Sequence, residues 1–434
     1  MGQWDGGTVG QWTVIRVVAV AVTAVCAVGV ARAQDTAQDR GVRIGITYAP
    51  GTRPALVVVP SARPLLDSVA TIVARDLDHS DRFEMVRAPA ALVDTADLRL
   101  TAALGAQFVV QVRLAGSGPE LVLRDGRSGD VLLRRSIGTT DADLLRWSAH
   151  AAADEVVRTV TGQAGVASTS LLFVRNGRLW RVEADGHGLR RVPSAGFPSL
   201  SPAWSRDGRR IAYTAFVRSG MPIVIQDLVT GAREVVPTTE RGLNITPAWS
   251  PDGRRLAFAH GTEAGTDIYV HEVGGGVQRL TVGRFSDNLS PTWSPDGSRI
   301  AFISTRARTP QLYVMNSDGT DQEVLARFDF GATGATSAPE WSPDGQAVAF
   351  HREVNGEPQI FVFDFGTRAL RQLTGSGRNE DPTWAPDGRH IAFVSSRGGA
   401  RNIWVVDLET GRLRQLTTGG GARLPAWSPR LTRN

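Results

Sequence analysis

The chain has 434 residues, 42% of them hydrophobic, with 47 glycines and 23 prolines. A chain of this length can hold two or three domains, and its many glycines and prolines indicate many turns. All of its basic residues are arginines and the formal net charge is only +5. A basic isoelectric point therefore reflects the high pKa of arginine rather than a large excess of charge.

The first 33 residues predict a cleaved secretory signal. Residues 17–31, VVAVAVTAVCAVGVA, form a 15-residue apolar run that follows Arg16 and ends in an A-x-A sequence at 31–33. A membrane-spanning helix needs about 20 apolar residues, whereas a shorter run before A-x-A is typical of a signal peptide. We expect cleavage after Ala33 and export to the periplasm.

The only cysteine, Cys26, lies inside this apolar run. An alternative interpretation of the segment beginning at Thr23 is a lipobox, although Val25 fits poorly in the position before the cysteine. After cleavage at Ala33 the mature chain would contain no thiol. Disulfide bonds and thiol chemistry are then excluded.

Residues 34–165 predict a small α/β domain. Strands are expected at VRIGITY (42–48), ALVVVP (55–60), FEMV (83–86) and LGAQFVVQVRL (104–114), and a hairpin at ELVLRDGRSGDVLLRRSI (120–137). DADLLRWSAHAAADEVVRTVTG (141–162) predicts a helix with acidic residues at its start and a glycine at its end. A second helix is expected in PLLDSVATIVARDLDHS (64–80), with one apolar face formed by Leu66, Val69, Ile72, Val73 and Leu77. A short linker follows near Gly165.

From residue 166 the chain is repetitive. Five copies of a phrase such as WSPDGSRIAF (293–302) occur, in which Ser-Pro-Asp-Gly predicts a tight turn before a buried strand. Two further strands follow in each repeat, and this period with four strands is typical of a β-propeller blade. We expect the repeated tryptophans to pack between blades rather than to stack on a ligand. They are Trp204, Trp249, Trp293, Trp341, Trp384 and Trp427.

The two ends of the repeat region complement each other. The first blade-like segment, 171–192, has no tryptophan strand before it, and the last tryptophan segment, LPAWSP (424–429), has no strands after it. A tandem array of open modules would leave both partial repeats unexplained. The sequence therefore predicts a multidomain α/β and all-β protein, in which residues 166–434 form a six-bladed β-propeller closed by the C-terminal strand.

Several of these segments resemble the TolB family. They are VRIGITYAPGTRPALVVVP (42–60), DSVATIVARDLDHSDRFEMV (67–86), LGAQFVVQV (104–112), HAAADEVVRTVTGQAGVASTSLLFV (150–174), the WSPDG repeats and the terminal LPAWSP. The resemblance covers essentially all of residues 42–430. It implies a non-enzymatic, monomeric component of the Tol–Pal cell-envelope system, without metal or cofactor, that supports outer-membrane integrity and envelope constriction during division.

The resemblance also implies that one propeller face binds the peptidoglycan-associated lipoprotein Pal, which would associate the protein peripherally with the outer membrane. In the family this face is built from loops that precede the tryptophan strands, here 241–247, 283–291, 331–339 and 375–382. The loops do not match the family motif residue by residue. The candidate binding residues are Leu243, Asn244, Asp287, Asn288, Leu289, Arg378, Asn379, Glu380 and Asp381.

A second implied partner is the inner-membrane protein TolA, bound by the mature N-terminal segment from about residue 34 to residue 48. The first eight residues of this segment are polar and could donate a strand to a partner. The alternative is an untethered tail without a role. The candidate binding residues are Gln34, Asp35, Asp39, Val42 and Ile44.

The sequence also bears on other classes of function. An enzyme is disfavoured because the chain has no G-x-S-x-G nucleophile motif and no H-E-x-x-H spacing among its seven histidines. A cation held by carboxylates and carbonyls in the propeller channel stays open. Nucleic-acid binding is not expected, because the arginines are spread along the blade turns, while binding of anionic envelope polymers stays open. The main alternative is a generic periplasmic propeller scaffold that serves a different envelope complex.

Overall fold

The computed structural model describes residues 53–431, except 117, 139–140, 219, 239–241, 284 and 326–334. The expected signal, the expected strand at 42–48 and the five candidate residues of the N-terminal segment lie outside the described residues. Gly45–Asn434 forms one compact unit. No helix in the described part of the chain is long and apolar enough to cross a membrane.

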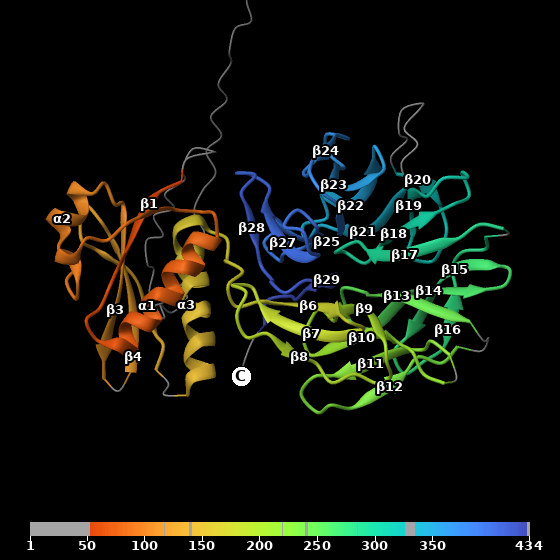
Figure 1. Cartoon of the computed structure of the whole chain (residues 1–434), viewed down its shortest axis with the longest axis horizontal. Coiled ribbons are helices and arrows are strands. Elements are labelled where there is room, and N and C mark those ends of the chain that lie inside the picture. The colour runs from red at the N-terminus through yellow and green to blue at the C-terminus, as the bar shows by residue number, and fades with distance from the viewer. Residues whose placement is uncertain are drawn as a thin grey trace, which may run out of the picture. The chain divides into compact units, whose positions relative to one another are not determined.

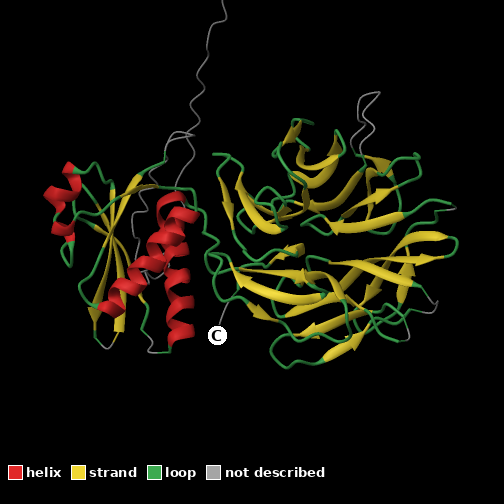
Figure 2. Cartoon of the chain, in the orientation of Figure 1, coloured by secondary structure: helices red, strands yellow, loops and turns green. Residues whose placement is uncertain are grey.

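The first part of the described chain is a five-stranded sheet with the strand order β2-β1-β3-β4-β5. β1 pairs in parallel with β2 and β3, whereas β3, β4 and β5 pair antiparallel. Two helices, α1 and α3, pack on one face of this sheet (Figure 2) and bury a shared apolar core with it. The strands are β1 (Ala55–Val59), β2 (Glu84–Val86), β3 (Phe108–Ala115), β4 (Gly118–Asp125) and β5 (Val131–Ser136).

Both predicted helices are present. α1 (Pro64–His79) has a proline in its first turn, where no backbone hydrogen bond is lost. It buries the expected apolar face, except that Ile72 is only half-buried. α3 (Ala142–Thr161) is capped by the carboxylate of Asp141, which accepts a hydrogen bond from the Leu144 amide at 2.9 Å. It ends at Gly162, whose φ of 79° is the left-handed conformation that glycine favours.

The expectation of only two helices in this domain was wrong. A third helix, α2 (Leu98–Ala103), and a 3-10 turn, η1 (Ala90–Leu92), pack with the other face of the sheet. Six residues are too few to establish a helical period in the sequence. The signal that remained was Asp97, whose side chain caps α2 by accepting hydrogen bonds from two backbone amides.

The rest of the chain forms six four-stranded antiparallel sheets, which are the blades of a propeller. In each blade the innermost strand ends in the repeated tryptophan, and the blades are numbered along the ring from the one that contains β6.

Blade 1 consists of β29 (Ala422–Trp427), β6 (Ser170–Arg175), β7 (Arg178–Glu183) and β8 (Arg190–Arg191). Blade 2 consists of β9 (Ser199–Trp204), β10 (Arg210–Ala215), β11 (Ile223–Asp227) and β12 (Arg233–Val235). Blade 3 consists of β13 (Leu243–Trp249), β14 (Arg255–Thr262), β15 (Gly265–Glu272) and β16 (Val277–Arg279).

Blade 4 consists of β17 (Asn288–Trp293), β18 (Arg299–Ser304), β19 (Gln311–Asn316) and β20 (Glu323–Val324). Blade 5 consists of β21 (Thr336–Trp341), β22 (Ala347–Val354), β23 (Glu357–Asp364) and β24 (Leu370–Gln372). Blade 6 consists of β25 (Asn379–Trp384), β26 (His390–Ser395), β27 (Asn402–Asp407) and β28 (Leu413–Gln415).

The ring closes as the sequence predicted. β29, near the C-terminus, pairs antiparallel with β6 of the first blade, with Trp427 opposite Leu171. Figure 1 shows this strand, in blue, beside the yellow β6. Ser428 reinforces the closure, because its amide donates to the Ser170 carbonyl at 2.8 Å and its hydroxyl accepts from the Ser170 amide at 3.0 Å. The closure leaves no unpaired sheet edge where the chain ends meet.

The six tryptophans lie between blades, which confirms their predicted packing role. Each is buried, with an exposed fraction of 5–9%. Trp293 of blade 4 donates from its indole nitrogen to the Ala248 carbonyl of blade 3 at 3.2 Å. The guanidinium of Arg255, also in blade 3, lies 4.5 Å from the Trp293 ring centroid. Each blade thus holds its neighbour through apolar contact, a hydrogen bond or a cation–π contact.

Candidate functional site

The nine candidate residues predicted for the propeller face all gather at one end of the propeller. We call this end the entry face: it is where the innermost strand of each blade begins. The loops that join one blade to the next and the hairpins between the second and third strands of each blade also lie there, because neighbouring strands run antiparallel. The turns with the Ser-Pro-Asp-Gly sequence lie at the opposite end.

The expectation that these residues occupy loops was wrong for seven of the nine. The innermost strands begin earlier than the tryptophan motif suggests, so that Leu243, Asn288 and Asn379 are the first residues of β13, β17 and β25. Only Asp287 and Arg378 precede a strand. Each innermost strand also contains a β-bulge, which hides the alternation of its side chains in the sequence.

Three of the candidates are buried asparagines that hold the entry face together. Asn244, Asn288 and Asn379 have exposed fractions of 3%, 0% and 0%. The Asn379 side chain donates to Gln359 Oε1 at 2.8 Å and accepts from Arg397 at 3.1 Å. Asn288 donates to an Asp267 oxygen at 2.9 Å and accepts from Arg306 at 2.9 Å. These amides fix the starts of their strands and have no surface to offer a partner.

Sequence analysis missed the arginines that complete these networks. Arg306 and Arg397 each follow the second strand of a blade in a Ser-x-Arg sequence, and each donates to the serine hydroxyl, at 2.8 Å from Ser304 and 3.0 Å from Ser395. Each guanidinium also stacks over an aromatic ring of its own blade. The repeated Ser-x-Arg is the signal in the sequence that could have identified them.

Asp381 is one of the carboxylate residues of the entry face. It sits at the bulge of β25 with a φ of 53°, its amide donates to His351 Nδ1 at 3.1 Å, and its carboxylate accepts from the Leu424 amide at 3.3 Å. Burial raises the pKa of Asp381, and burial lowers the pKa of His351. A neutral imidazole agrees with the geometry, because Nδ1 accepts a hydrogen bond from the Asp381 amide.

The entry face also carries exposed apolar side chains. Phe285 is 99% exposed and Val282 is 73% exposed, both in the loop between β16 and β17, while Leu243 is 37% exposed. Arg378 is exposed as well and pairs with Glu380 at 3.1 Å. Phe285 lies within a predicted binding loop but was not singled out from the sequence.

The opposite end of the channel opens into a cavity of about 300 Å³. Its lining comes from all six blades and consists mainly of the repeated tryptophan, serine and proline residues. Glu340 adds a carboxyl group, and burial raises the pKa of this group to about 7. Its oxygen accepts a hydrogen bond from the Trp384 amide at 3.2 Å, so the side chain also joins two blades.

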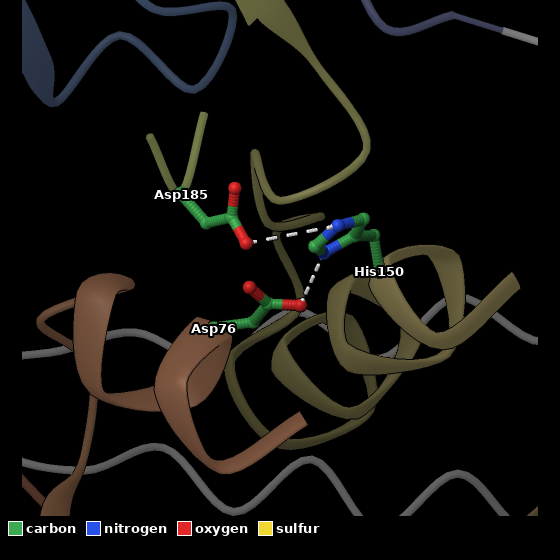
Figure 3. Close-up of side chains that lie close together, drawn as sticks. All are labelled: Asp76, His150 and Asp185. Carbon is green, nitrogen blue, oxygen red and sulfur yellow. Dashed lines mark hydrogen bonds and ion pairs between the residues drawn. The ribbon is translucent and has the colours of Figure 1, made fainter. Parts of the chain in front are cut away.

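Two groups of histidine and carboxylate side chains lie where the α/β domain contacts blades 1 and 6. In the first, His150 lies between Asp76 and Asp185 (Figure 3). In the second, His390 lies between Asp81 and Asp407. Their ligand-type atoms lie within 4.8 Å of one another in each group, as in a metal site. Sequence analysis missed both groups, because their members are far apart in the chain; Asp81 and His390, for example, are 309 positions apart.

The charges of these groups favour ion pairs over a metal ion. Asp185 already pairs with Arg75 at 2.5 Å and with Arg146. Asp407 pairs with Arg389, and Asp81 pairs with Arg412 at 3.1 Å. A divalent cation would have to share its ligands with these guanidinium groups, which repel it. We therefore interpret both groups as buried ion-pair clusters.

Residues 157–329 and 326–433 match the PD40 family, described as the TolB beta propeller domain. The chain belongs to the TolB β-propeller family. A relative from Xanthomonas oryzae pv. oryzae, named Tol-Pal system protein TolB, is 30% identical over 234 residues, which cover 48% of this chain and 52% of the relative. The chain thus spans about half the length of the curated relatives that it matches.

A solved structure extends the similarity beyond the propeller. TolB from Acinetobacter baumannii is 26% identical with a TM-score of 0.75, covering 88% of this chain and 98% of that one. Because the propeller alone cannot supply 88% of the chain, the similarity includes the α/β domain. The hydrazine synthase of Kuenenia stuttgartiensis, at 15% identity and a TM-score of 0.52, shares the fold alone. The chain is therefore a TolB-like protein and not merely a propeller.

Proposed function

We propose that this protein is the TolB component of a Tol–Pal cell-envelope system. In this role it is a non-enzymatic periplasmic scaffold that binds a Pal-like lipoprotein through the entry face and a TolA-like inner-membrane protein through its mature N-terminal segment. It thereby supports outer-membrane integrity and envelope constriction during division. The observation that carries the proposal is the similarity to TolB of A. baumannii across both domains.

The entry face carries both kinds of side chain that protein-binding surfaces combine. Interfaces depend on a few apolar or aromatic anchors surrounded by polar groups. Phe285 and Val282 supply exposed apolar side chains, and Arg378 with Glu380 supplies charged ones. The buried asparagines beneath them hold the strand starts in place, so that a partner meets a preformed surface.

A calorimetric titration tests the proposal directly. The processed, exported protein is titrated with the soluble domain of the Pal homologue of the same organism, at low and at high salt. We expect saturable one-to-one binding that persists at high salt, because an apolar contact is not screened. Absence of binding under both conditions would overturn the Pal assignment and favour a scaffold for another envelope complex.

The N-terminal partner needs its own test. A chain that starts at Gly41 lacks the polar residues 34–40 but keeps both folded domains. We expect this chain to lose binding to the C-terminal domain of the TolA homologue while it keeps one-to-one binding to the Pal homologue. Equal TolA binding by both chains would contradict the assignment of the segment.

A further inference from the structure

The contact between the α/β domain and the propeller is built from charged side chains. Every buried apolar cluster in the described residues belongs either to the α/β domain or to the propeller with its linker residue Val166. The second half of α1 and the residues after it instead present charged groups to blades 1 and 6. These groups are Arg75, Asp76, Asp78, Asp81 and Arg82.

The first cluster surrounds His150 of α3, which is 2% exposed. Its Nδ1 lies 2.6 Å from an oxygen of Asp76 in α1. Its Nε2 lies 3.6 Å from Glu183 and 3.9 Å from Asp185, both of blade 1. Figure 3 shows the imidazole between the Asp76 and Asp185 carboxylates. The imidazole of one domain thus points a ring nitrogen at carboxylates of the other.

In the second cluster the histidine belongs to the propeller, whereas in the first it belongs to the α/β domain. His390 of blade 6 is 1% exposed, and its Nδ1 lies 2.7 Å from Asp387 of the same blade. Its Nε2 lies 3.4 Å from Asp81, which follows α1, and 3.5 Å from Asp407. Both clusters therefore place a buried imidazole between carboxylates of the two domains.

This geometry favours protonation of both imidazoles. A neutral imidazole carries one N–H, and its other nitrogen presents a lone pair. With one nitrogen bound to Asp76 or Asp387, that lone pair would face two further carboxylates at less than 4 Å. A protonated ring presents an N–H on both sides, which turns each repulsion into an attraction.

The balance of the other charged groups around each histidine favours this additional positive charge. Near His150 the carboxylates of Asp76, Glu183 and Asp185 face two guanidinium groups, those of Arg75 and Arg146, so that an imidazolium balances the charges. Three further titratable or charged groups face the carboxylates of this cluster. Asp154 of α3 and Arg414 of blade 6 interact with Asp76, and His187 of blade 1 lies 3.6 Å from Asp185.

Around His390 the carboxylates outnumber the guanidinium groups, so an imidazolium is again the missing cation. The carboxylates are those of Asp78, Asp81, Asp387, Asp407 and Glu409. The guanidinium groups are those of Arg82, Arg389 and Arg412, with Arg414 between the two clusters.

We propose that protonated His150 and His390 form a double latch that holds the α/β domain on the propeller, and that loss of either proton frees the domain to move. The latch is reversible, because the junction consists of charged groups rather than an apolar core. Water can solvate these groups once the two domains separate. The described apolar clusters do not cross the junction, so both domains keep their own cores when it opens.

The direction of the pH dependence follows from the pKa values. Burial disfavours the charged imidazole, but the hydrogen bonds and charges of the surrounding carboxylates outweigh it and raise the pKa of each histidine to about 9. The part of this rise that comes from carboxylates of the opposite domain gives docking energy, which is present at low pH and is lost as the pH rises through about 9. Each histidine changes the docking equilibrium by at most roughly 300-fold over this range.

The experiment measures the distance between two spin labels, one in each domain. The labels are placed at the exposed positions Ser68 of α1 and Val229 of blade 2, in a chain that carries Cys26→Ser. We expect a single narrow distance distribution near pH 7 and a broadened one near pH 10, with the open population rising at least about tenfold.

Substitutions distinguish opening of the latch from general effects of high pH on the protein. His150→Gln and His390→Gln should broaden the distribution already near pH 7, and the double variant should show no further change up to about pH 10. His260→Gln is the matched control, because His260 is equally buried (3% exposed) but lies inside blade 3. Its pH profile should follow that of the unsubstituted chain.

A more conservative variant covers the case in which a histidine variant does not fold. Arg412 is 39% exposed in its side chain and bridges Asp78 and Asp81 from the propeller, so Arg412→Gln should fold normally and lower the pH at which the distribution broadens. The proposal is overturned if the distribution of the unsubstituted chain is unchanged between about pH 7 and 10, or if the double variant remains as pH-dependent as that chain.

Discussion

The blade–blade junctions and the domain–propeller junction of this molecule are formed by different kinds of contact. Each of the six neighbouring blade pairs shares a buried apolar cluster that includes a repeated tryptophan. The domain–propeller junction has buried ion pairs centred on His150 and His390 instead. Apolar burial is insensitive to pH, whereas buried ion pairs depend on the charge of each member. The ring is therefore permanent, and the docking of the α/β domain is adjustable.

Removal of the closing strand is expected to have the largest effect. A chain that ends at Gly421 lacks β29 and therefore exposes the edge of β6 and the apolar cluster between blades 6 and 1. We expect this chain to aggregate or to lose its cooperative thermal transition, because an open ring presents an unpaired sheet edge. A normal melting curve would show that closure is not what holds the ring together.

Loss of a single blade–blade contact should have the next largest effect. Trp293→Ala removes a buried indole and its hydrogen bond to blade 3. Denaturant unfolding should show a loss of about 3–5 kcal/mol. Val229→Ala, at a position that is 80% exposed, serves as the control and should leave the stability unchanged. A comparable loss in both variants would argue against a packing role for the tryptophan.

The two kinds of junction should also differ in how their stability depends on pH. As the pH rises from about 6.5 to about 9, the junction should lose up to about 3 kcal/mol for each histidine. At the acid end the pKa of Glu183, lowered to about 2 because its bonds to His150 and Arg146 outweigh burial, gives a contribution that is lost as the pH falls through this value. Calorimetric unfolding across this range should therefore shift in the unsubstituted chain and much less at high pH in the double histidine variant.

A substitution on the entry face should act on binding without disturbing either junction. Phe285→Ala is expected to weaken binding of the Pal homologue by about 2 kcal/mol, because an exposed aromatic side chain is a typical interface anchor. Titration calorimetry measures the affinity, and Val229→Ala at the opposite end is the matched control. Equal affinities for the two variants would remove Phe285 from the interface.

The smallest effect is expected for the exposed ion pair on the same face. Arg378→Ala removes a contact with Glu380 in which the guanidinium is 44% exposed. Exposed ion pairs contribute about 0–1 kcal/mol to stability, so the melting temperature should hardly change. A large loss of stability would mean that Arg378 has a structural role like that of Arg397.

The features that could be predicted from the sequence depend on interactions between residues close together in the chain or on the repeat pattern. Ser-Pro-Asp-Gly predicted a turn, and Ser294 closes one such turn by accepting a hydrogen bond from the Arg299 amide at 2.9 Å. Gly297 adopts the positive φ of 72° that this turn requires. The complementary partial repeats predicted the pairing of β29 with β6, because a propeller leaves only one arrangement for them.

The features that the sequence concealed depend on distant segments or on irregular backbone. The bulges in the innermost strands shift the register, so that Asn288 and Asn379 face the interior although they read as loop residues. The latch residues come from α1, α3 and two blades, and no spacing in the chain links them. Charge in a helix usually indicates a solvated face, and Asp76 in α1 is instead buried.

Hydrogen–deuterium exchange of the protein, with and without the soluble domain of its Pal homologue, is the decisive test of the proposed function. We expect slower exchange on binding in residues 281–289 and 242–245 of the entry face, with unchanged exchange in the Ser-Pro-Asp-Gly turns at the opposite end. Protection of those turns, with the entry face unchanged, would contradict it.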